Sequence, residues 1–268
     1  MKRIELLDHG YIELIESWGS DERIIEAARM STGKGFNGWG SATCANCGAP
    51  WESTGAVPYP GTPRCPSGRG GGHTLAGEQG DEKLLRFLYE NKHATPFEMA
   101  GLIVEVKAPI FVFREWHRHR TQSFNEMSAR YTPLPNENYV PTVERLLVNS
   151  KTNKQAGTIA GADDLTEAKA EVFRKMIVAH YDQAEDIYQE ALLAGVPKEL
   201  ARVHLPVGRY SRMRASANLR NWLAFLTLRM APNAQWEIRQ YANAIGSFIE
   251  KTFSRTWELF IGEQVKNG

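Results

Sequence analysis

The sequence predicts a helix-rich α+β fold, a single domain built around a mixed or antiparallel sheet. Segments with apolar residues at helical spacing alternate along the chain with shorter, strand-like segments, and there is no internal repeat. The 268 residues, 42% of them hydrophobic, are enough for one large core or two small ones. We therefore expect one domain over residues 1–268.

The first thirty residues predict a strand or hairpin followed by a short helix. Residues 4–18 are rich in β-branched and aromatic side chains. Ser20 is a typical helix cap and is followed by two acids, and the apolar residues after it favour a helix ending near Met30.

Between residues 33 and 80 the composition changes to Gly, Pro, Ser and Thr, with almost no aliphatic periodicity. Such a stretch cannot build a core of its own. We interpret residues 36–80 as a loop inserted into the domain.

Regular structure is predicted again from Asp81, which can cap a helix over 81–92. Pro96 ends that helix, and residues 99–109 alternate as a strand does. Pro109 then favours a helix through residue 120, because proline suits the first helical turn.

The second half is mainly helical. Residues 148–164 have the composition of a surface loop, and Asp163 or Asp164 starts the longest periodic segment, which ends near Gly195. The remaining predicted elements are a short helix at 198–206, a strand at 207–218, and helices at 218–230 and 233–260.

Charge and hydropathy exclude several classes of protein. A net charge of +1 argues against broad nucleic-acid binding, and no apolar run is long enough to span a membrane. The N-terminal residues lack the apolar core of a signal peptide. We expect a cytoplasmic protein with no membrane or nucleic-acid partner.

Cations gather in RHRTQSFNEMSARY, residues 118–131, where a single acid, Glu126, stands among the basic residues. Arginine recurs in the last third, partly among apolar residues, at Arg202, Arg209, Arg212, Arg214, Arg220 and Arg229. A buried guanidinium needs a carboxylate or an anionic ligand, so either internal ion pairs or a nucleotide site would explain the pattern. Guanidinium groups suit phosphate oxygens, and neither a Walker loop nor a Ser-His-Asp order is present.

Six motifs in order resemble those of the flavin-dependent thymidylate synthases. The signature motif is Arg-His-Arg, followed after seven residues by Ser, from Arg118 to Ser128. The others are HATPFE at 93–98, SFNEMSARY at 123–131, ARVHLP at 201–206, NLR at 218–220 with LTLR at 226–229, and NAQWEIRQYA at 233–242. The resemblance covers about residues 1–35 and 81–260.

The resemblance implies a thymidylate synthase-complementing-like fold and the conversion of dUMP to dTMP. Methylenetetrahydrofolate would give the methylene group, FAD the hydride, and NADPH would reduce the flavin. It also implies a homotetramer whose sites combine residues of several subunits.

Site residues carry over by position. FAD would be bound by Thr95, Arg118, His119, Arg120, Glu126, Asn218, Leu219 and Arg220. The nucleotide would be bound by Glu115, Trp116, His117, Arg118, Glu126, Met127, Ser128, Ala129, Arg130, Arg202 and Arg229.

Arg229 is the residue expected to act in catalysis. By the resemblance it would face the pyrimidine and favour ionisation of the ring at N3. A charged arginine stabilises negative charge on the ring, which activates C5 without a cysteine nucleophile. All three cysteines lie in the insert, which suits that mechanism. Ser128 could be a nucleophile, but no general base is evident beside it, so we favour a hydrogen-bonding role.

Two positions depart from the family pattern. Glu115 stands where relatives usually have Gln beside the nucleotide, and Ala224 where they have His or Asn near the flavin. The acid is unexpected beside a phosphate, and Ala224 removes a polar contact.

The insert contains half of a zinc knuckle, Cys44 and Cys47, and a possible second half in Cys65 and His73. A degenerate knuckle that binds no zinc, or a plain glycine-rich loop, also explains the pattern, so we do not make a metal part of the function. Two other hypotheses for the function stay open. The protein could bind nucleic acid through the knuckle and the arginine clusters, or it could be an inactive relative that still binds the flavin.

Overall fold

The structure is a computed structural model, and it describes residues 2–39, 42–44, 50–51, 75–76, 80–150, 153–160 and 162–267. The chain divides into two compact units, each assembled from separated segments. Unit 1 comprises Met1–Glu16, Leu102–Ala217 and Ala224–Gly246, and unit 2 comprises Ser17–Gly101, Asn218–Leu223 and Ser247–Gly268. The extent of the predicted domain and its insert stays a prediction.

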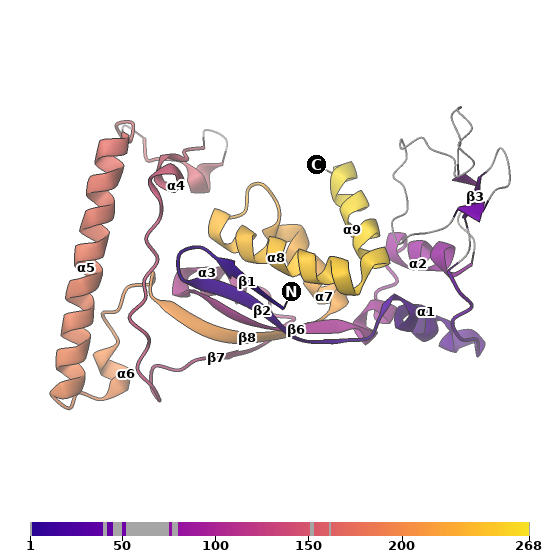
Figure 1. The fold of residues 1–268 in the computed structure, drawn as a ribbon, viewed down its shortest axis with the longest axis horizontal. Coiled ribbons are helices and arrows are strands. Elements are labelled where there is room, and N and C mark those ends of the chain that lie inside the picture. The colour runs from indigo at the N-terminus through magenta and orange to yellow at the C-terminus, as the bar shows by residue number, and fades with distance from the viewer. Residues whose placement is uncertain are drawn as a thin grey trace. The chain divides into compact units, whose positions relative to one another are not determined.

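Unit 1 is built on a five-stranded sheet in the order β1-β2-β6-β8-β7 (Figure 1). The strands are β1 (Arg3–Leu6), β2 (Gly10–Trp18), β6 (Gly101–Pro109), β7 (Ser123–Glu126) and β8 (Tyr210–Asn218), with a few terminal residues assigned to unit 2. The β1/β2 hairpin and the β7/β8 pair are antiparallel. The predicted fold class, a helix-rich α+β protein with a mixed or antiparallel sheet, is confirmed, as is the N-terminal hairpin.

Helices account for most of the remaining described residues. They are α1 (Asp21–Arg29), α2 (Asp81–Glu90), α3 (Ile110–Trp116), α4 (Val143–Leu147), α5 (Glu167–Leu193), α6 (Lys198–Ala201), α7 (Leu219–Arg229), α8 (Trp236–Thr252) and α9 (Ser254–Asn267). Short 3₁₀ helices are η1 (Met30–Thr32), η2 (Thr95–Met99) and η3 (Lys154–Ala156). None of the helices among the described residues has the length and apolar character that a membrane span needs.

Strand alternation decides which side chains enter the core of unit 1. In β6 the residues Val104 and Val106 are fully buried, as a strand with one apolar face requires. In β8 Met213 is buried, while its neighbours Arg212 and Arg214 point to solvent. These two arginines are therefore exposed and need no buried anionic partner.

Gly10 shows how closely the backbone packs at the start of β2. A Cβ atom there would lie 2.8 Å from the carbonyl oxygen of Leu6 and 2.9 Å from that of Lys107. The Tyr241 hydroxyl donates to the same Lys107 oxygen at 2.8 Å, so the backbone has little room to move. Only glycine fits this position.

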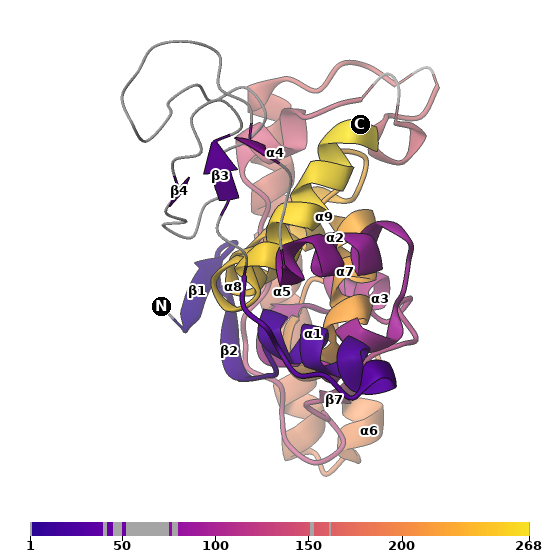
Figure 2. The same cartoon turned by 90° about the vertical axis from the view of Figure 1, so that its right-hand side faces the viewer.

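Unit 2 packs α1, α2 and α9 around an apolar core, and α1 lies beside α2 in both views (Figure 1, Figure 2). Ser20 caps α1 as predicted, its hydroxyl accepting from the amide of Arg23. The prediction that Asp81 caps α2 is wrong, because Gly80 occupies the cap position. The Asp81 carboxylate is instead fully buried and accepts from Arg29 Nε at 2.9 Å and from the Asn37 amide at 2.6 Å.

The two ends of the insert meet within unit 2. Trp39 forms a backbone bridge with Gly80, and the Asp81 amide donates to the Gly38 carbonyl at 3.3 Å. The chain therefore leaves and returns at one place, as an insertion requires. Three short strands inside it, β3 (Ala42–Cys44), β4 (Pro50–Trp51) and β5 (Leu75–Ala76), form a small antiparallel sheet that the loop interpretation did not foresee.

Several helix boundaries differ from the predicted ones. The helix after Pro109 ends at Trp116 rather than at residue 120, since the chain turns there, with the His119 amide bonded to the Trp116 carbonyl. The long helix α5 begins after Thr166, whose hydroxyl accepts from Lys169, rather than at Asp163 or Asp164. The last predicted helix is broken at Phe253 into α8 and α9.

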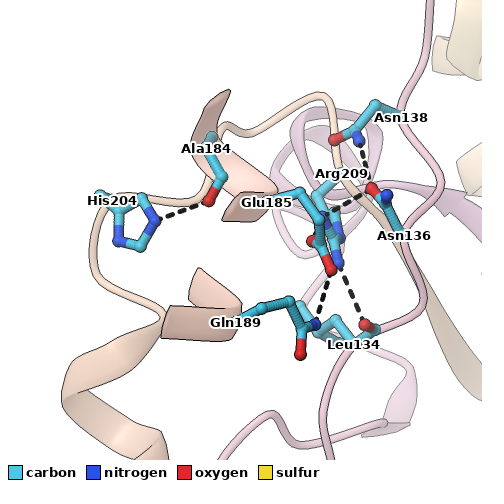
Figure 3. A network of polar contacts seen from close by, with 8 residues as sticks. All are labelled: Leu134, Asn136, Asn138, Ala184, Glu185, Gln189, His204 and Arg209. Carbon is cyan, nitrogen blue, oxygen red and sulfur yellow. Dashed lines mark hydrogen bonds and ion pairs between the residues drawn. The ribbon is translucent and has the colours of Figure 1, made fainter. Parts of the chain in front are cut away.

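A buried arginine ties three segments of unit 1 together (Figure 3). Arg209 is fully buried just before β8 and donates to Glu185 of α5 at 2.6 Å. It also donates to the carbonyl of Leu134 and the side chain of Asn136, both in the segment that follows the signature. The internal ion pair considered for this arginine is thus present.

We expect Arg209→Ala to lower the free energy of unfolding by about 3–5 kcal/mol, because it leaves the Glu185 carboxylate buried without its cation. Urea unfolding at fixed protein concentration measures the loss. The double variant R209M/E185L, which removes both charges, should recover much of the stability. A double variant as unstable as Arg209→Ala would contradict this account.

Candidate active site

The predicted catalytic residue, Arg229, forms the centre of a compact polar cluster in unit 1. It lies at the end of α7 with its side chain 16% exposed. Nη1 donates to the Glu115 carboxylate at 2.8 Å and Nη2 to the Glu115 carbonyl at 2.9 Å, so the end of α3 holds the guanidinium through side chain and backbone. The carboxylate that a buried Arg229 requires is therefore supplied by the family departure, Glu115.

His119 completes the cluster. The Arg229 Nε donates to His119 Nε2 at 2.8 Å, which makes that nitrogen the acceptor and places the ring proton on Nδ1. Burial, together with the positive charge of Arg229, lowers the pKa of His119 to about 4, and Glu115 opposes the shift. The ring also packs edge-on against Phe225, with centroids 4.7 Å apart. His119 is neutral at physiological pH.

The serine of the signature lies in a turn after strand β7. Ser128 Oγ accepts from the Arg130 amide at 3.3 Å, and the Ser128 carbonyl accepts from the amides of Tyr131 and Thr132. In the described part of the chain no histidine or carboxylate is hydrogen-bonded to this hydroxyl. The arrangement favours a structural, hydrogen-bonding serine over a nucleophile.

The residues around Ser128 are held by the neighbouring strand. Glu126 ends β7 opposite Met213, and the Met127 amide donates to the Arg212 carbonyl at 2.8 Å. Ala129 is buried, whereas Glu126 is exposed. Pairing with β8 therefore fixes the backbone of the signature.

Several predicted anion-binding arginines are exposed. Arg118 and Arg120 follow α3 on a turn, and neither has an ion-pair partner among the described residues. Arg130 reaches Glu199 at 3.3 Å, with both side chains more than half exposed, a pair that contributes little stability. Arg202 is also exposed, so the expectation that it is a buried guanidinium in need of an anionic partner was wrong.

Trp116 and His117, also predicted to bind nucleotide, differ in environment. Trp116 is fully buried, and its indole N–H donates to Gln122 at 2.9 Å. His117 is exposed, with Nε2 lying 3.1 Å from the sulfur of Met213. Trp116 is thus a core residue at the base of the turn.

The other predicted flavin-binding residues lie in unit 2. Thr95 is exposed at the start of η2, and Arg220 of α7 forms an ion pair at 2.5 Å with Glu98, which ends the HATPFE motif. Asn218 accepts from the Asn221 amide and so caps the start of α7, while Leu219 is buried. Of these residues only Thr95 and Arg220 present exposed polar groups.

Glu98, which pairs with the predicted flavin-binding residue Arg220, was not among the predicted residues although the HATPFE motif contains it. The motif was informative, but the pairing with Arg220, 122 residues further along the chain, has no local signal. The same holds for Glu115 and Arg229, which are 114 residues apart.

The zinc ligands considered for the insert cannot be compared with the structure. Cys47, Cys65 and His73 lie outside the described residues, and Cys44 is described only as part of β3. Within the described ranges, no group of three or more His, Cys, Asp or Glu side chains could hold a metal ion.

Comparisons with known proteins match nearly the whole chain. Residues 13–253 match the model of the family described as "Thymidylate synthase complementing protein". The chain belongs to this family. It is 36% identical over 257 residues to a flavin-dependent thymidylate synthase of Thermus thermophilus, covering 96% of this chain and 77% of the relative. It is 32% identical over 269 residues to the Thermosipho africanus enzyme of the same name, covering 98% of each.

Solved structures of similar fold point to the same enzyme family. The UMP/dUMP methylase PolB from Streptomyces cacaoi bound with 5-Br UMP has a TM-score of 0.69 and 29% identity, covering 96% of both chains. The form bound with 5-Br dUMP has a TM-score of 0.68 and 31% identity, covering 97% of both. The resemblance inferred from the six motifs is confirmed.

The His119 pKa gives the first test of the site. We expect Arg229→Met to raise this pKa from about 4 part of the way toward 6.5, since burial remains, and Glu115→Gln to lower it, since an opposing negative charge is lost. Titration of the His119 ring signals by NMR distinguishes the two directions. Equal pKa values in the three proteins would refute the arrangement.

The same shift has a consequence for stability. Between pH 6.5 and about 4 the unfolded chain binds a proton at His119 that the folded chain does not, so His119 makes the free energy of unfolding fall as the pH falls. In Arg229→Met the pH range over which His119 lowers the free energy of unfolding should be narrower. Urea unfolding at a series of pH values measures this range.

Proposed function

We propose that this protein methylates dUMP to dTMP reductively, with methylenetetrahydrofolate as the methylene donor and FAD, reduced by NADPH, as the hydride source. What carries the proposal is Arg229, a nearly buried guanidinium in direct contact with a histidine of the RHR signature, in a member of this family. The names of the relatives, flavin-dependent thymidylate synthase and UMP/dUMP methylase, support the same reaction.

The described residues have the chemistry that FAD needs. Arg118 and Arg120 offer exposed guanidinium groups with no ion-pair partner in the described chain, which suits the phosphates of a dinucleotide. Thr95 and Arg220 add an exposed hydroxyl and a further cation. When bound, FAD supplies the hydride, while the protein binds and orients the reactants.

Arg229 is the residue that we assign to the pyrimidine. It stays protonated at every working pH, so it stabilises negative charge that develops on the ring, and the low exposure of its side chain strengthens the effect. Arg130 and Arg202 bind the nucleotide phosphate in this proposal, together with the backbone from Glu126 to Arg130. No cysteine acts as a nucleophile.

The assay is tritium release from [5-³H]dUMP with FAD, NADPH and methylenetetrahydrofolate. We expect release to need all three and to fall by roughly 10²–10³-fold in Arg229→Ala, because an electrostatic stabiliser of the transition state is lost. Arg23→Ala, which removes an exposed arginine of α1 paired with Glu26, is the control and should keep the activity.

The failures of this assay are informative. Folded, yellow protein without release would identify a flavin-binding relative that lacks the chemistry. Colourless protein that binds oligonucleotides with a steep salt dependence would favour the nucleic-acid-binding alternative.

We further propose that the protein works as a homotetramer. Helix α5 exposes a stripe of large apolar side chains, Val172, Phe173, Met176 and Ile187, which recur at helical spacing. An exposed apolar stripe of this kind is typical of an interface between chains.

Light scattering after size exclusion tests the assembly. The wild-type mass should be that of four chains, and F173E/M176E should lower it, because two charges then lie in the contact. Val148→Glu, at an exposed valine outside α5, is the control and should leave the mass unchanged. A double variant with the wild-type mass would exclude α5 as the contact.

A further inference from the structure

The connection between α3 and β7 is closed by a hydrogen bond between two side chains. Helix α3 ends at Trp116 and β7 begins at Ser123, so the arginines of the signature lie on the turn formed by residues 117–122. The indole N–H of the fully buried Trp116 donates to Gln122 Oε1 at 2.9 Å. Because Gln122 is the last residue before β7, this bond joins the two ends of the turn.

The chemistry of the two groups fixes the orientation of the Gln122 amide. An indole N–H can only donate, so the atom that it meets must be the amide oxygen. The amide nitrogen is buried and has no acceptor among the residues that the structure describes. A buried donor without a partner costs stability and offsets the gain from the bond to the indole. The effect of Gln122 is therefore expected in the turn rather than in the free energy of unfolding.

The turn presents two cations that need a fixed backbone. Arg118 and Arg120 lie on either side of His119, and both are exposed without an ion-pair partner among the described residues. A long exposed arginine loses rotamer freedom when it binds a phosphate, so a backbone that is already ordered lowers the cost of binding. The anchor of the turn is itself held in the core, because the Trp116 ring packs against Phe225 with centroids 4.8 Å apart.

We propose that Gln122 is a positioning residue that closes this turn and holds Arg118 and Arg120 ready for the phosphates of FAD; this inference rests on the proposed function. Gln122 acts through the two arginines rather than by touching the flavin. Without the bond, the turn must be ordered when FAD binds. Affinity should then fall by the contribution of one hydrogen bond, roughly 2- to 10-fold.

Hydrogen exchange of residues 117–122, measured by mass spectrometry on flavin-free protein, tests the turn. Gln122→Met keeps the length of the side chain and removes the acceptor, so exchange of this segment should rise by roughly 2- to 10-fold. The urea midpoint should stay close to the wild-type value, because the unpartnered amide nitrogen is removed as well. Gln122→Glu keeps an oxygen for the indole and should exchange as the wild type does. Gln155→Met, at an exposed glutamine of η3, is the matched control.

A double variant shows whether the bond itself holds the turn. Trp116→Phe keeps an aromatic ring in the core and removes the N–H donor. Since both substitutions break the same bond, W116F/Q122M should exchange residues 117–122 no faster than the faster of the two single variants. Effects of the two substitutions that multiply would mean that the turn does not depend on this bond, and would overturn the inference.

Titration with FAD, followed by flavin fluorescence, tests the consequence for the site. We expect Gln122→Met to bind FAD roughly 2- to 10-fold more weakly. At saturating FAD it should release tritium from [5-³H]dUMP at the wild-type rate, because Gln122 orders the turn and takes no part in the chemistry. The added charge of Gln122→Glu itself acts on an anionic ligand, so that variant is compared by hydrogen exchange alone.

The failures of these experiments are distinguishable. Equal exchange of residues 117–122 in Gln122→Met and the wild type, or faster exchange with unchanged FAD affinity, would refute the inference alone. A lower urea midpoint with faster exchange throughout unit 1 would identify Gln122 as an ordinary core residue and would also overturn it. Wild-type protein that binds no FAD and releases no tritium would refute the proposed function and this inference with it.

Discussion

The cost of burying a guanidinium group organises both units of this protein. Arginine cannot lose its proton, so each one that leaves water needs an anion within hydrogen-bonding distance. Arg209 meets Glu185, Arg145 meets Glu237, Arg29 meets Asp81, and Arg229 meets Glu115. All four pairs join residues distant in sequence, so each also joins separate segments of its unit. The long segment from the signature to α5 is held by two of them, through Arg209 and through Arg145.

Strand and helix geometry decide which arginines need such a partner. In β8 the alternation of the strand turns Arg212 and Arg214 to solvent, although Met213 between them is buried. Arg209 precedes the strand and Arg229 ends a helix, and both side chains turn inward. Position within an element, rather than the composition of the neighbourhood, therefore separates exposed cations from buried ones.

Local patterns predicted the fold well and the pairing poorly. The hairpin, the cap of α1 at Ser20 and the strand β6 follow from residues adjacent in sequence, and the structure contains all three. Asp81 is a residue type that is preferred at helix caps. Its carboxylate nevertheless pairs with Arg29, 52 residues earlier, because tertiary contacts outweigh a capping preference. The motifs, through their resemblance to the family, predicted which residues would form the site. They could not indicate that Glu115 is the partner of Arg229, since periodicity carries no information about contacts between distant segments.

The two kinds of arginine in the candidate site suit two kinds of ligand group. Arg118 and Arg120 are exposed and have no ion-pair partner among the described residues. Their charge is therefore available to phosphates, which are always anionic. Arg229 is neutralised by Glu115, so in the proposed reaction it first meets a ring without charge, and the stabilisation it offers grows only as the ring becomes negative. Stabilisation that increases along the reaction lowers the barrier, whereas an unpaired cation would also bind the ground state. An acid beside the arginine that we assign to the pyrimidine, unexpected from the family pattern, is therefore compatible with the proposed reaction.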